Sequence, residues 1–461
     1  MDILFKNGTV INADGRSNTD VAVSDGKIIK VEQNITPESG TQVIDCTNLL
    51  VLPGAIDAHV HFELPLKIGA DNIPYQSADD FYTGTRAAAC GGVTTIIDFV
   101  SPGADESLVA ALYKRKAAAD DKACIDYSLH MGLSQVNETV LREMQEVVNA
   151  GVSSFKVFMT YAQRLDDDAF FEVLKRSKEL DALVMVHAEA HEELVSLRAQ
   201  FLAEGKTDAW YHYLSRPEAV ETKGVEKAIE LAVKAGASLY IVHLACEGGM
   251  KAVERIQSAL KAQGKKHMIY AETCPQYLHF SNEVYKRSDA CNFICSPPIK
   301  GEKSRQALWE GIKDGSISTI ATDHCPFNLA EKAAGADNFT NIPNGVMGTE
   351  VFYPYMLSHA VRGEITFERV VGLCCAKPAE IFKLKNKKGK IAEGLDADII
   401  VYDPNREHII SRKNSHSVAD YTIWEDVTLK GYPIQTYSRG VSIYKNGEFL
   451  GKPGQGKFLK R

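Results

Sequence analysis

The chain has 461 residues, of which 45% are apolar and 24% charged, and its formal net charge is −8 at pH 7. This composition is typical of a globular protein larger than one domain, and the negative charge argues against nucleic acid or an anionic membrane as the main partner. No apolar run reaches the ~18–20 residues that span a bilayer. The N-terminus has no secretory pattern, and the ten cysteines form no CxxC pair, so a reduced, cytoplasmic location is expected.

Residues 1–51 and 386–461 both alternate apolar and polar positions between turn signals such as Asn7-Gly8 and Asp25-Gly26. Asn-Gly and Asp-Gly pairs are typical of tight hairpins between short antiparallel strands. We therefore expect the two ends of the chain to meet in one small composite β-sandwich domain. The tail, residues 451–461, is expected to lie on the surface.

Residues 52–385 change to apolar runs separated by helical segments. Predicted strands cover 54–62, 92–100, 124–132, 153–159, 183–189, 238–245, 267–274 and 318–326, and helices cover 80–91, 169–181 and 224–237. Eight strand–helix units predict an α/β fold with a (β/α)8 TIM barrel. A doubly wound open sheet would show the same alternation, but no glycine-rich phosphate loop follows the first strand, which disfavours it.

Polar residues gather where the predicted strands end, and in such a barrel the carboxyl ends of the strands form the active-site face. They are His59 and His61 on the first strand, His187 on the fifth, His243 on the sixth and Asp323 on the eighth. His59 and His61 are two positions apart, so their side chains leave the same face of the strand. Imidazoles with a carboxylate suit Zn²⁺ or a similar ion, so this pattern predicts a metal site. Six other histidines are interpreted as structural: His130, His191, His212, His267, His279 and His359.

Lys156 interrupts the apolar fourth strand, where burying an unpaired ammonium would cost several kcal/mol or more. Four histidines and an aspartate exceed what one four-coordinate ion with an open position can use, so two ions joined by a bridging anion are the economical solution. Two such cations would drive the lysine amine to neutrality. A neutral amine adds CO₂ to form a carbamate, whose two oxygens can bridge both ions. The alternative is a lysine whose head group reaches solvent at the strand end.

Seven segments together resemble the dihydropyrimidinase/hydantoinase branch of the cyclic amidohydrolases: "GAIDAHVHF", "GVSSFKVFM", "VMVHAEA", "IVHLA", "ICSPP", "ATDHCPF" and "IPNGVMGTE". The resemblance covers nearly the whole chain, including the divided β-domain. It implies a metal-dependent barrel with a carboxylated lysine, usually a homotetramer. Such an enzyme opens small cyclic ureides to N-carbamoyl amino acids without an organic cofactor.

The resemblance also implies a division of the metal ligands between two divalent ions. One ion, the more buried, would be held by His59, His61, Lys156 and Asp323, and the other by Lys156, His187 and His243. Zn²⁺ is expected, although Mn²⁺ and Co²⁺ suit the same ligands.

Further residues match the family by motif. The resemblance implies that Tyr161, five residues after the lysine, donates a hydrogen bond to the developing oxyanion, and that Asp323 carries a proton from the nucleophile to the departing nitrogen. Ser296 in "CSPP" and Asn344 in "IPNG" match positions whose backbone groups hold the amide edge of the ring. An interfacial aromatic and ordinary turn residues remain the structural alternatives for Tyr161, Ser296 and Asn344.

The choice among relatives rests on few residues. Glu63 stands where dihydroorotases usually have an arginine for the substrate carboxylate, so we expect it to repel that substrate. Allantoinases share the metal ligands but generally lack the tyrosine, so allantoin is the second choice. A metal-free homologue that serves as an assembly protein is the alternative from another class. The apolar residues Leu64, Leu66, Ile68 and Phe158 favour a 5-substituted, aryl hydantoin, although plain packing would explain them equally.

Overall fold

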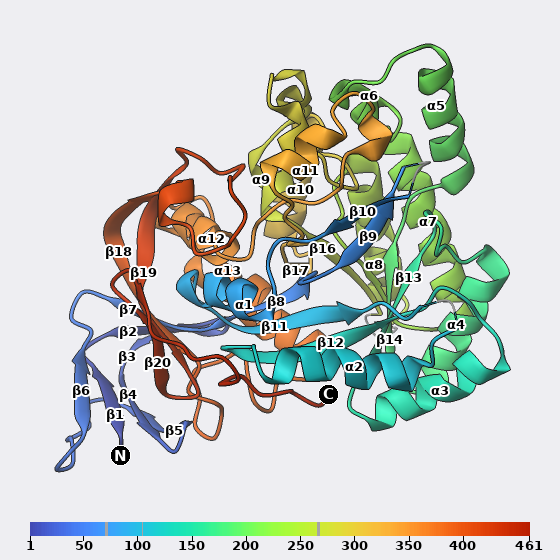
Figure 1. The fold of residues 1–461 in the computed structure, drawn as a ribbon. Coiled ribbons are helices and arrows are strands. Elements are labelled where there is room, and N and C mark those ends of the chain that lie inside the picture. The colour runs from blue at the N-terminus through green and yellow to red at the C-terminus, as the bar shows by residue number, and fades with distance from the viewer. Residues whose placement is uncertain (70–71, 104, 265–267) are drawn as a thin grey trace.

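The computed structural model describes residues 1–69, 72–103, 105–264 and 268–461, so His267, interpreted above as structural, lies outside the described residues. Figure 1 shows a barrel surrounded by helices, with a β-rich region beside it that contains the first strands of the chain and the last long ones. None of the described helices is both long and apolar enough to cross a membrane.

Eight parallel strands form the barrel sheet, as predicted. In chain order they are β8 (Ala55–Val60), β11 (Val93–Val100), β12 (Asp126–Gly132), β13 (Ser154–Phe158), β14 (Leu183–His187), β15 (Leu239–Ile241), β16 (Ile269–Thr273) and β17 (Thr319–Ile320). Each strand pairs with the next one along the chain. The first and last strands meet only at their carboxyl ends, where the amide of His61 donates to the carbonyl of His324 (2.8 Å) and Val60 bridges His324.

Helices follow the strands and cover the barrel. They are α1 (Phe81–Cys90), α2 (Leu108–Asp120), α3 (Glu138–Asn149), α4 (Asp167–Glu179), α5 (His191–Ala203), α6 (Ala209–Leu214), α7 (Glu218–Ala235), α8 (Glu247–Ala262), α9 (Pro275–His279), α10 (Glu302–Asp314), α11 (Leu329–Ala334), α12 (Phe352–Val361), α13 (Phe367–Val371) and α14 (Lys377–Ile381). Short turns of other helix types are η1 (Asn282–Lys286), η2 (Ala290–Phe293), η3 (Phe339–Asn341), η4 (Gly372–Ala376) and η5 (Arg412–Asn414). Local sequence starts several of the α-helices: Asp80 accepts from the amide of Thr83 (2.8 Å) at α1, and Asp166 accepts from the amide of Ala169 (2.8 Å) at α4.

Two sheets form the β-rich region. One contains β5 (Lys27–Glu32), β4 (Asp20–Ser24), β1 (Ile3–Lys6) and β6 (Gln42–Asp45) in that spatial order. The other contains β21 (Glu448–Phe449), β20 (Val441–Lys445), β19 (Thr428–Ser438), β18 (Ile399–Ile409), β7 (Leu50–Pro53), β2 (Thr9–Asn12) and β3 (Gly15–Asn18).

The second sheet joins the two ends of the chain, because β18 pairs with β7. Phe5 and Val23 from the first sheet and Ile399 and Val401 from the second lie in one apolar cluster, so the sheets pack on each other. Asp25 has a left-handed backbone (φ 50°) and joins β4 to β5 in an antiparallel hairpin, as predicted. The predicted hairpin at Asn7-Gly8 is wrong, because β1 and β2 lie in different sheets and this turn leads from one sheet to the other. The domain limits at 51/52 and 385/386 stay a prediction.

The tail lies on the surface, as predicted, with Lys452, Lys457 and Lys460 exposed, but Leu459 is buried and anchors it to the barrel. The amide of Leu459 donates to the carbonyl of Tyr127 (2.7 Å), and Leu459 is 5% exposed. The guanidinium of Arg461 donates through Nε to Ser128 Oγ (2.7 Å) and through Nη2 to Ser154 Oγ (2.9 Å). The tail thus satisfies polar groups near the starts of β12 and β13, which a chain ending earlier would leave buried without partners.

A buried lysine links the barrel to the β-rich region. Lys388 Nζ donates to Asp126 of β12 and to Asp398 just before β18, both at 2.7 Å, and it lies 3.0 Å from Asp396. The three carboxylates raise the pKa of Lys388 above its usual value despite the opposing effect of burial. The charge of this lysine is therefore fully compensated.

Candidate metal centre and substrate pocket

All nine predicted site residues line one cavity of about 580 Å³ at the carboxyl ends of the barrel strands. They are His59, His61, Lys156, Tyr161, His187, His243, Ser296, Asp323 and Asn344. The structure brings these side chains together from strands β8, β13, β14 and from loops that follow the strands. The strand-end rule therefore located the cavity correctly.

His59, His61 and Asp323 form the tightest group in the cavity. Asp323 Oδ1 lies 3.2 Å from His59 Nε2 and 3.1 Å from His61 Nε2, and one ligand atom from each residue lies within 4.8 Å of the others. His59 Nδ1 contacts the buried Glu272 carboxylate at 2.8 Å, which orients the ring and leaves Nε2 facing the cavity. His59 Nε2 is buried without a hydrogen-bond partner, as expected of a nitrogen reserved for a metal ion.

His187 and His243 form a second group beside the first. His187 Nδ1 lies 3.1 Å from His243 Nε2, and the other His187 nitrogen contacts Glu189 at 2.7 Å. The guanidinium of Arg216 in turn pairs with Glu189 and holds the pKa of that buried carboxyl at about 2, although burial alone would raise it. A carboxylate therefore orients one histidine in each group.

His59, His187 and His243 are neutral near pH 7. Burial lowers the pKa values of His59, His187 and His243, and the Lys156 amine lowers them further. Burial alone would raise the pKa of Asp323, but His59, His61 and Lys156 hold it below its usual value. Neutral imidazoles and an ionised carboxylate are the protonation states that bind divalent metal ions, so these residues fit the predicted metals.

Lys156 points from β13 into the same cavity and is 1% exposed. Among the described residues, none forms a hydrogen bond or ion pair with its Nζ, which instead lies 5.4 Å from the ring centre of Phe99 and 5.1 Å from that of Phe158. Burial lowers the pKa of Lys156 to about 8, with Asp323 and Glu272 acting in the opposite direction. The amine is thus buried and easily neutralised, and its head group does not reach solvent.

Tyr161 stands at the edge of the metal ligands with its ring centre 5.1 Å from that of His187. Its backbone has φ 74°, a left-handed conformation that is costly for an aromatic residue and typical of functional sites. Burial raises the pKa of Tyr161, so the phenol keeps its proton and can donate a hydrogen bond. Ser296 Oγ and Asn344 Oδ1 are buried without hydrogen-bond partners, which leaves both free for a ligand.

Lys332 fixes the two loops that carry Ser296 and Asn344. Its buried Nζ donates to the carbonyls of Ile294 (2.9 Å), Pro343 (2.7 Å) and Gly345 (2.7 Å). One ammonium therefore joins the segment before Ser296 to both neighbours of Asn344.

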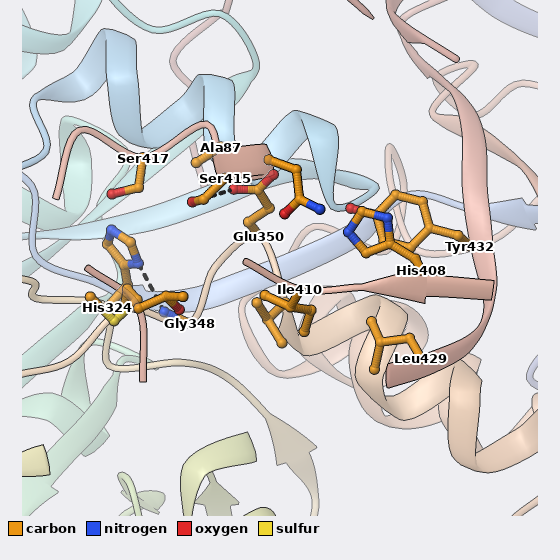
Figure 2. Close-up of a pocket in the computed structure, with 14 residues that line it drawn as sticks. Ala87, His324, Gly348, Glu350, His408, Ile410, Ser415, Ser417, Leu429 and Tyr432 are labelled. Atoms are coloured by element: carbon orange, nitrogen blue, oxygen red, sulfur yellow. Dashed lines mark hydrogen bonds between the residues drawn. The ribbon is translucent and has the colours of Figure 1, made fainter. Parts of the chain in front are cut away.

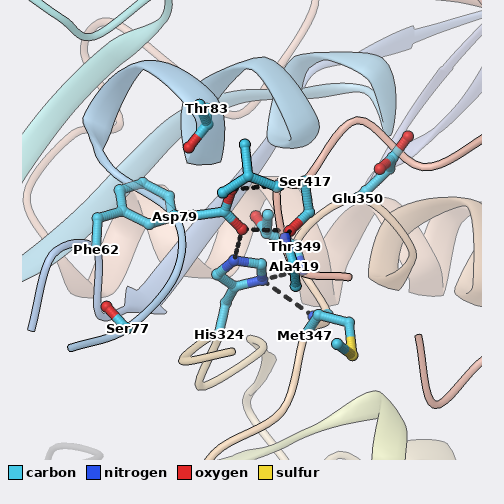
Figure 3. A network of polar contacts seen from close by, with 12 residues as sticks. Phe62, Ser77, Asp79, Thr83, His324, Met347, Thr349, Glu350, Ser417 and Ala419 are labelled. Carbon is cyan, nitrogen blue, oxygen red and sulfur yellow. Dashed lines mark hydrogen bonds and ion pairs between the residues drawn. The ribbon is translucent and has the colours of Figure 1, made fainter. Parts of the chain in front are cut away.

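His324, next to Asp323, is held by a polar network on its far side. Figure 3 shows His324 contacting Asp79, which also accepts from Ser417. The distance from His324 Nε2 to Asp79 Oδ2 is 3.0 Å, and His324 Nδ1 accepts from the amide of Gly348 (3.1 Å). Behind it lies a hollow of about 20 Å³, shown in Figure 2, lined by His324, Glu350 and Tyr432 among others. The network fixes the backbone at Asp323 (φ 53°), and the hollow is too small for a substrate.

One residue after the first strand lies differently from its predicted role. The segment that follows β8 forms the hairpin β9 (Pro65–Ile68) and β10 (Ile73–Gln76), and Leu64, Leu66 and Ile68 line the cavity with Phe158. Glu63 does not line the cavity; its carboxylate pairs with Lys122. The expectation that Glu63 repels an anionic substrate is therefore wrong.

Sequence reasoning gave no role to several residues that the structure places around the metal ligands. Glu272, Arg216, Lys332 and Asp79 are all buried and contact a site residue or its loop. Glu272 lies in the predicted seventh strand, so its position inside a buried apolar run was an available signal. The other three belong to helices or loops, whose approach to the site depends on tertiary packing.

The chain is similar to several known proteins over its full length. The model of the amidohydrolase family matches residues 50–443. D-phenylhydantoinase of Escherichia coli (strain K12) is 40% identical, with 100% of this chain and 98% of that protein covered. Among solved structures, dihydropyrimidinase from Brevibacillus agri NCHU1002 has a TM-score of 0.95 at 37% identity, covering 100% and 99%. L-hydantoinase from Arthrobacter aurescens has a TM-score of 0.89 at 26% identity, covering 100% of both chains.

Proposed function

Because the chain belongs to the amidohydrolase family, we propose that this enzyme hydrolyses the cyclic amide bond of hydantoins and dihydropyrimidines to give N-carbamoyl amino acids. The observation that carries the proposal is the group of His59, His61 and Asp323 beside Lys156, in a cavity lined by several apolar residues. Relatives named for this chemistry, which are similar over the whole chain, support it.

Two divalent ions, proposed to be Zn²⁺, would be held by these residues. His59, His61 and Asp323 would bind one ion and His187 and His243 the other, with Lys156 between them. Lys156 would add CO₂ through its neutral amine, which forms an N–C bond, releases one proton and yields a bridging carbamate. The lowered pKa of Lys156 and the absence of an ion-pair partner among the described residues support this role.

The ions, when bound, supply an activated water and polarise the ring carbonyl. Asp323 accepts the proton of the attacking water and gives it to the ring nitrogen as the C–N bond breaks. Tyr161 donates its phenolic proton in a hydrogen bond to the developing oxyanion. Ser296 and Asn344 hold the amide edge of the ring, so that the carbonyl carbon faces the water.

We propose that 5-substituted, and in particular aryl, hydantoins are preferred to unsubstituted dihydrouracil. Leu64, Leu66, Ile68 and Phe158 line the cavity and would pack against such a substituent. The D-phenylhydantoinase name of a relative supports the same choice. A higher kcat/KM for dihydrouracil than for 5-phenylhydantoin would contradict it.

The test of the function combines metal analysis with turnover. Protein purified after expression with Zn²⁺ should contain about two ions per chain and open 5-phenylhydantoin, with allantoin as a comparison substrate. A protein that binds no metal and opens none of these rings would instead support an assembly protein. Faster turnover of allantoin would assign the chain to allantoinases.

Assembly, location and domain limits complete the proposal. We propose a cytoplasmic homotetramer, since the resemblance implies four chains and all ten cysteines are free. Light scattering measures the assembly, and limited proteolysis tests the limits at 51/52 and 385/386.

A further inference from the structure

We propose that Arg198 makes the outer part of the cavity an anion-binding subsite, so that the enzyme accepts 5-substituted hydantoins whose substituent ends in a carboxylate. The inference deepens the proposed function and rests on it. Arg198 lies on α5 and lines the cavity of the metal ligands. It is neither a predicted site residue nor a neighbour of one in sequence.

Arg198 stands where two cavities meet. It lines the main cavity and also an adjoining cavity of about 420 Å³, which shares Tyr161 and Ala162 with the first. A substituent that leaves a ring bound beside Tyr161 and runs outward therefore passes Arg198. The side chain is half-buried, so its guanidinium is partly withdrawn from water before any ligand binds.

Arg198 makes no direct ion pair within the described chain, unlike neighbouring arginines, and the buried Glu189 that pairs with Arg216 acts on it only at a distance. Among the described residues, none forms a hydrogen bond or ion pair with Arg198, whereas Arg216 pairs with Glu189 and Arg164 lies 3.9 Å from Glu192. Within the described chain, Asp323 is the one carboxylate that lines the main cavity, and it lies between His59 and His61. The outer part of the cavity therefore lacks a protein anion.

Two further observations support an anion-binding subsite: a second cation without an ion-pair partner, and the lowered pKa of Arg198. Lys67 of β9 also lines the cavity, and no described residue pairs with it. Burial and the like charge of Arg216 lower the pKa of Arg198, so an anion placed there would relieve an existing repulsion. A guanidinium binds a carboxylate through two parallel hydrogen bonds, which gives direction as well as affinity.

The apolar residues of the cavity determine which kind of group can link the hydantoin ring to the carboxylate. Leu64, Leu66 and Phe158 line the same cavity as Arg198. An aryl linker can therefore pack against these apolar side chains while its carboxylate pairs with the guanidinium. The Glu63 carboxylate pairs with Lys122 and so does not oppose such a substrate. The substrate class is therefore a hydantoin whose 5-substituent has an apolar stem and an acidic tip.

The experiment compares three substrates of similar size with the metal-loaded enzyme. They are 5-phenylhydantoin, 5-(4-carboxyphenyl)hydantoin and its neutral amide, 5-(4-carbamoylphenyl)hydantoin. In the wild type we expect the acid to exceed the amide in kcat/KM by about ten- to hundredfold, the range of one charge-assisted contact. Added NaCl should reduce this ratio, since the subsite is partly open to water.

Variants identify the residue responsible. Arg198→Gln should bring the acid-to-amide ratio close to one, and Arg198→Lys should retain most of it. Arg142→Gln removes an exposed arginine of α3 and should leave the ratio as in the wild type. An unchanged ratio in Arg198→Gln overturns the subsite while turnover of 5-phenylhydantoin still upholds the function. Failure to open any of the three substrates overturns the function itself.

Discussion

Lys156 and Lys388 are both almost fully buried, at 1% and 3% exposure, but the charges around them differ completely. Lys388 has three carboxylates within 3.0 Å, and its pKa is raised. Lys156 has no ion-pair partner among the described residues, and burial lowers its pKa to about 8. A buried lysine with its anions in place is structural, whereas one with neither anions nor hydrogen-bond acceptors around its amine indicates a group that is missing from the polypeptide.

The residues around the two lysines also differ in how completely their polar atoms are hydrogen-bonded. At the barrel mouth, Tyr161, His243 and Asp323 have positive φ angles, and polar atoms of His59, Ser296 and Asn344 lack partners. At the Lys388 junction, Asp126 also accepts from the amide of Lys457 (2.9 Å) and pairs with Arg439. A positive φ does not distinguish the two places, since Arg439 also has φ 45°, but the unpartnered atoms at the barrel mouth face a cavity in which a ligand can compensate them.

The largest effect is expected from Lys156→Ala. Removing the bridging group should reduce bound metal and lower turnover of 5-phenylhydantoin by at least about a hundredfold. Propionate or another short carboxylic acid should restore part of both, because its carboxylate can occupy the place of the carbamate. Metal analysis and rate measurements with and without the acid test this, and a fully active variant would exclude the bridging role.

Lys388→Met should instead destabilise the fold and leave the metal content unchanged. Removing one partner leaves three carboxylates buried beside one another, which typically costs about 3–5 kcal/mol. Denaturant titration of the variant measures the free energy of unfolding. If this variant lost metal while keeping its stability, the contrast between the two lysines would be wrong.

Tyr161→Phe tests the proposed hydrogen bond to the oxyanion without changing any residue proposed to bind a metal ion. Without the phenolic proton, kcat should fall by about 10²–10³-fold, the usual effect of losing one oxyanion donor, while the metal content stays at the wild-type value. Tyr113→Phe, at a tyrosine that is 57% exposed, is the matched control. A kcat equal to that of the wild type would leave Tyr161 as an interfacial aromatic.

The pH dependence of the free energy of unfolding should also show that the pKa of Lys156 is lower than that of an ordinary lysine. In enzyme stripped of metal and CO₂, the folded pKa of Lys156, about 8, lies below the ordinary lysine value of 10.5, so the unfolded chain binds more protons between these values. Stability should therefore rise with pH from about 8 to 10.5, by up to about 3 kcal/mol. The measurement is the difference in free energy of unfolding between wild type and Lys156→Met across this range. A flat difference would contradict the lowered pKa.

The smallest effect on activity is expected from a substitution at Lys332, a buried lysine whose Nζ donates to three backbone carbonyls. Lys332→Met should loosen the loops of Ser296 and Asn344 and raise KM by about tenfold, with a smaller change in kcat. Lys313→Met, at an exposed position of α10, controls for the lost charge. An effect on kcat alone would place Lys332 outside substrate positioning.

The sequence allowed the barrel and the residues that line its cavity to be predicted because both depend on local pattern. The apolar runs set β8 to β17, and the strand-end rule then gathered His59, His187 and Asp323 at one face. The hairpins at Asp25-Gly26 and Asn446-Gly447 followed from their turn residues, whereas Asn7-Gly8 joins two strands of different sheets. In each case a residue type determines a backbone geometry without help from distant segments.

What the sequence did not reveal depends on distant contacts. The burial of Leu459 and Arg461 requires polar groups of β12 and β13 that lie about three hundred residues away in the chain. Glu63 pairs with Lys122 of a later loop, and Arg198 reaches the cavity only because α5 packs at its edge. Short-range sequence patterns contain no information on contacts between segments that are far apart in the chain.

The barrel seam has a consequence for how this protein responds to its ions. β8 and β17 do not pair along their lengths, and the His61 amide bond to His324 lies directly beside His59 and Asp323. An ion held there would cross-link the first and last strands at the point where the cylinder is most easily opened. Chelation should thus accelerate deuterium uptake by the His61 amide before any distant strand responds, and this one proton would report metal loading in the absence of substrate.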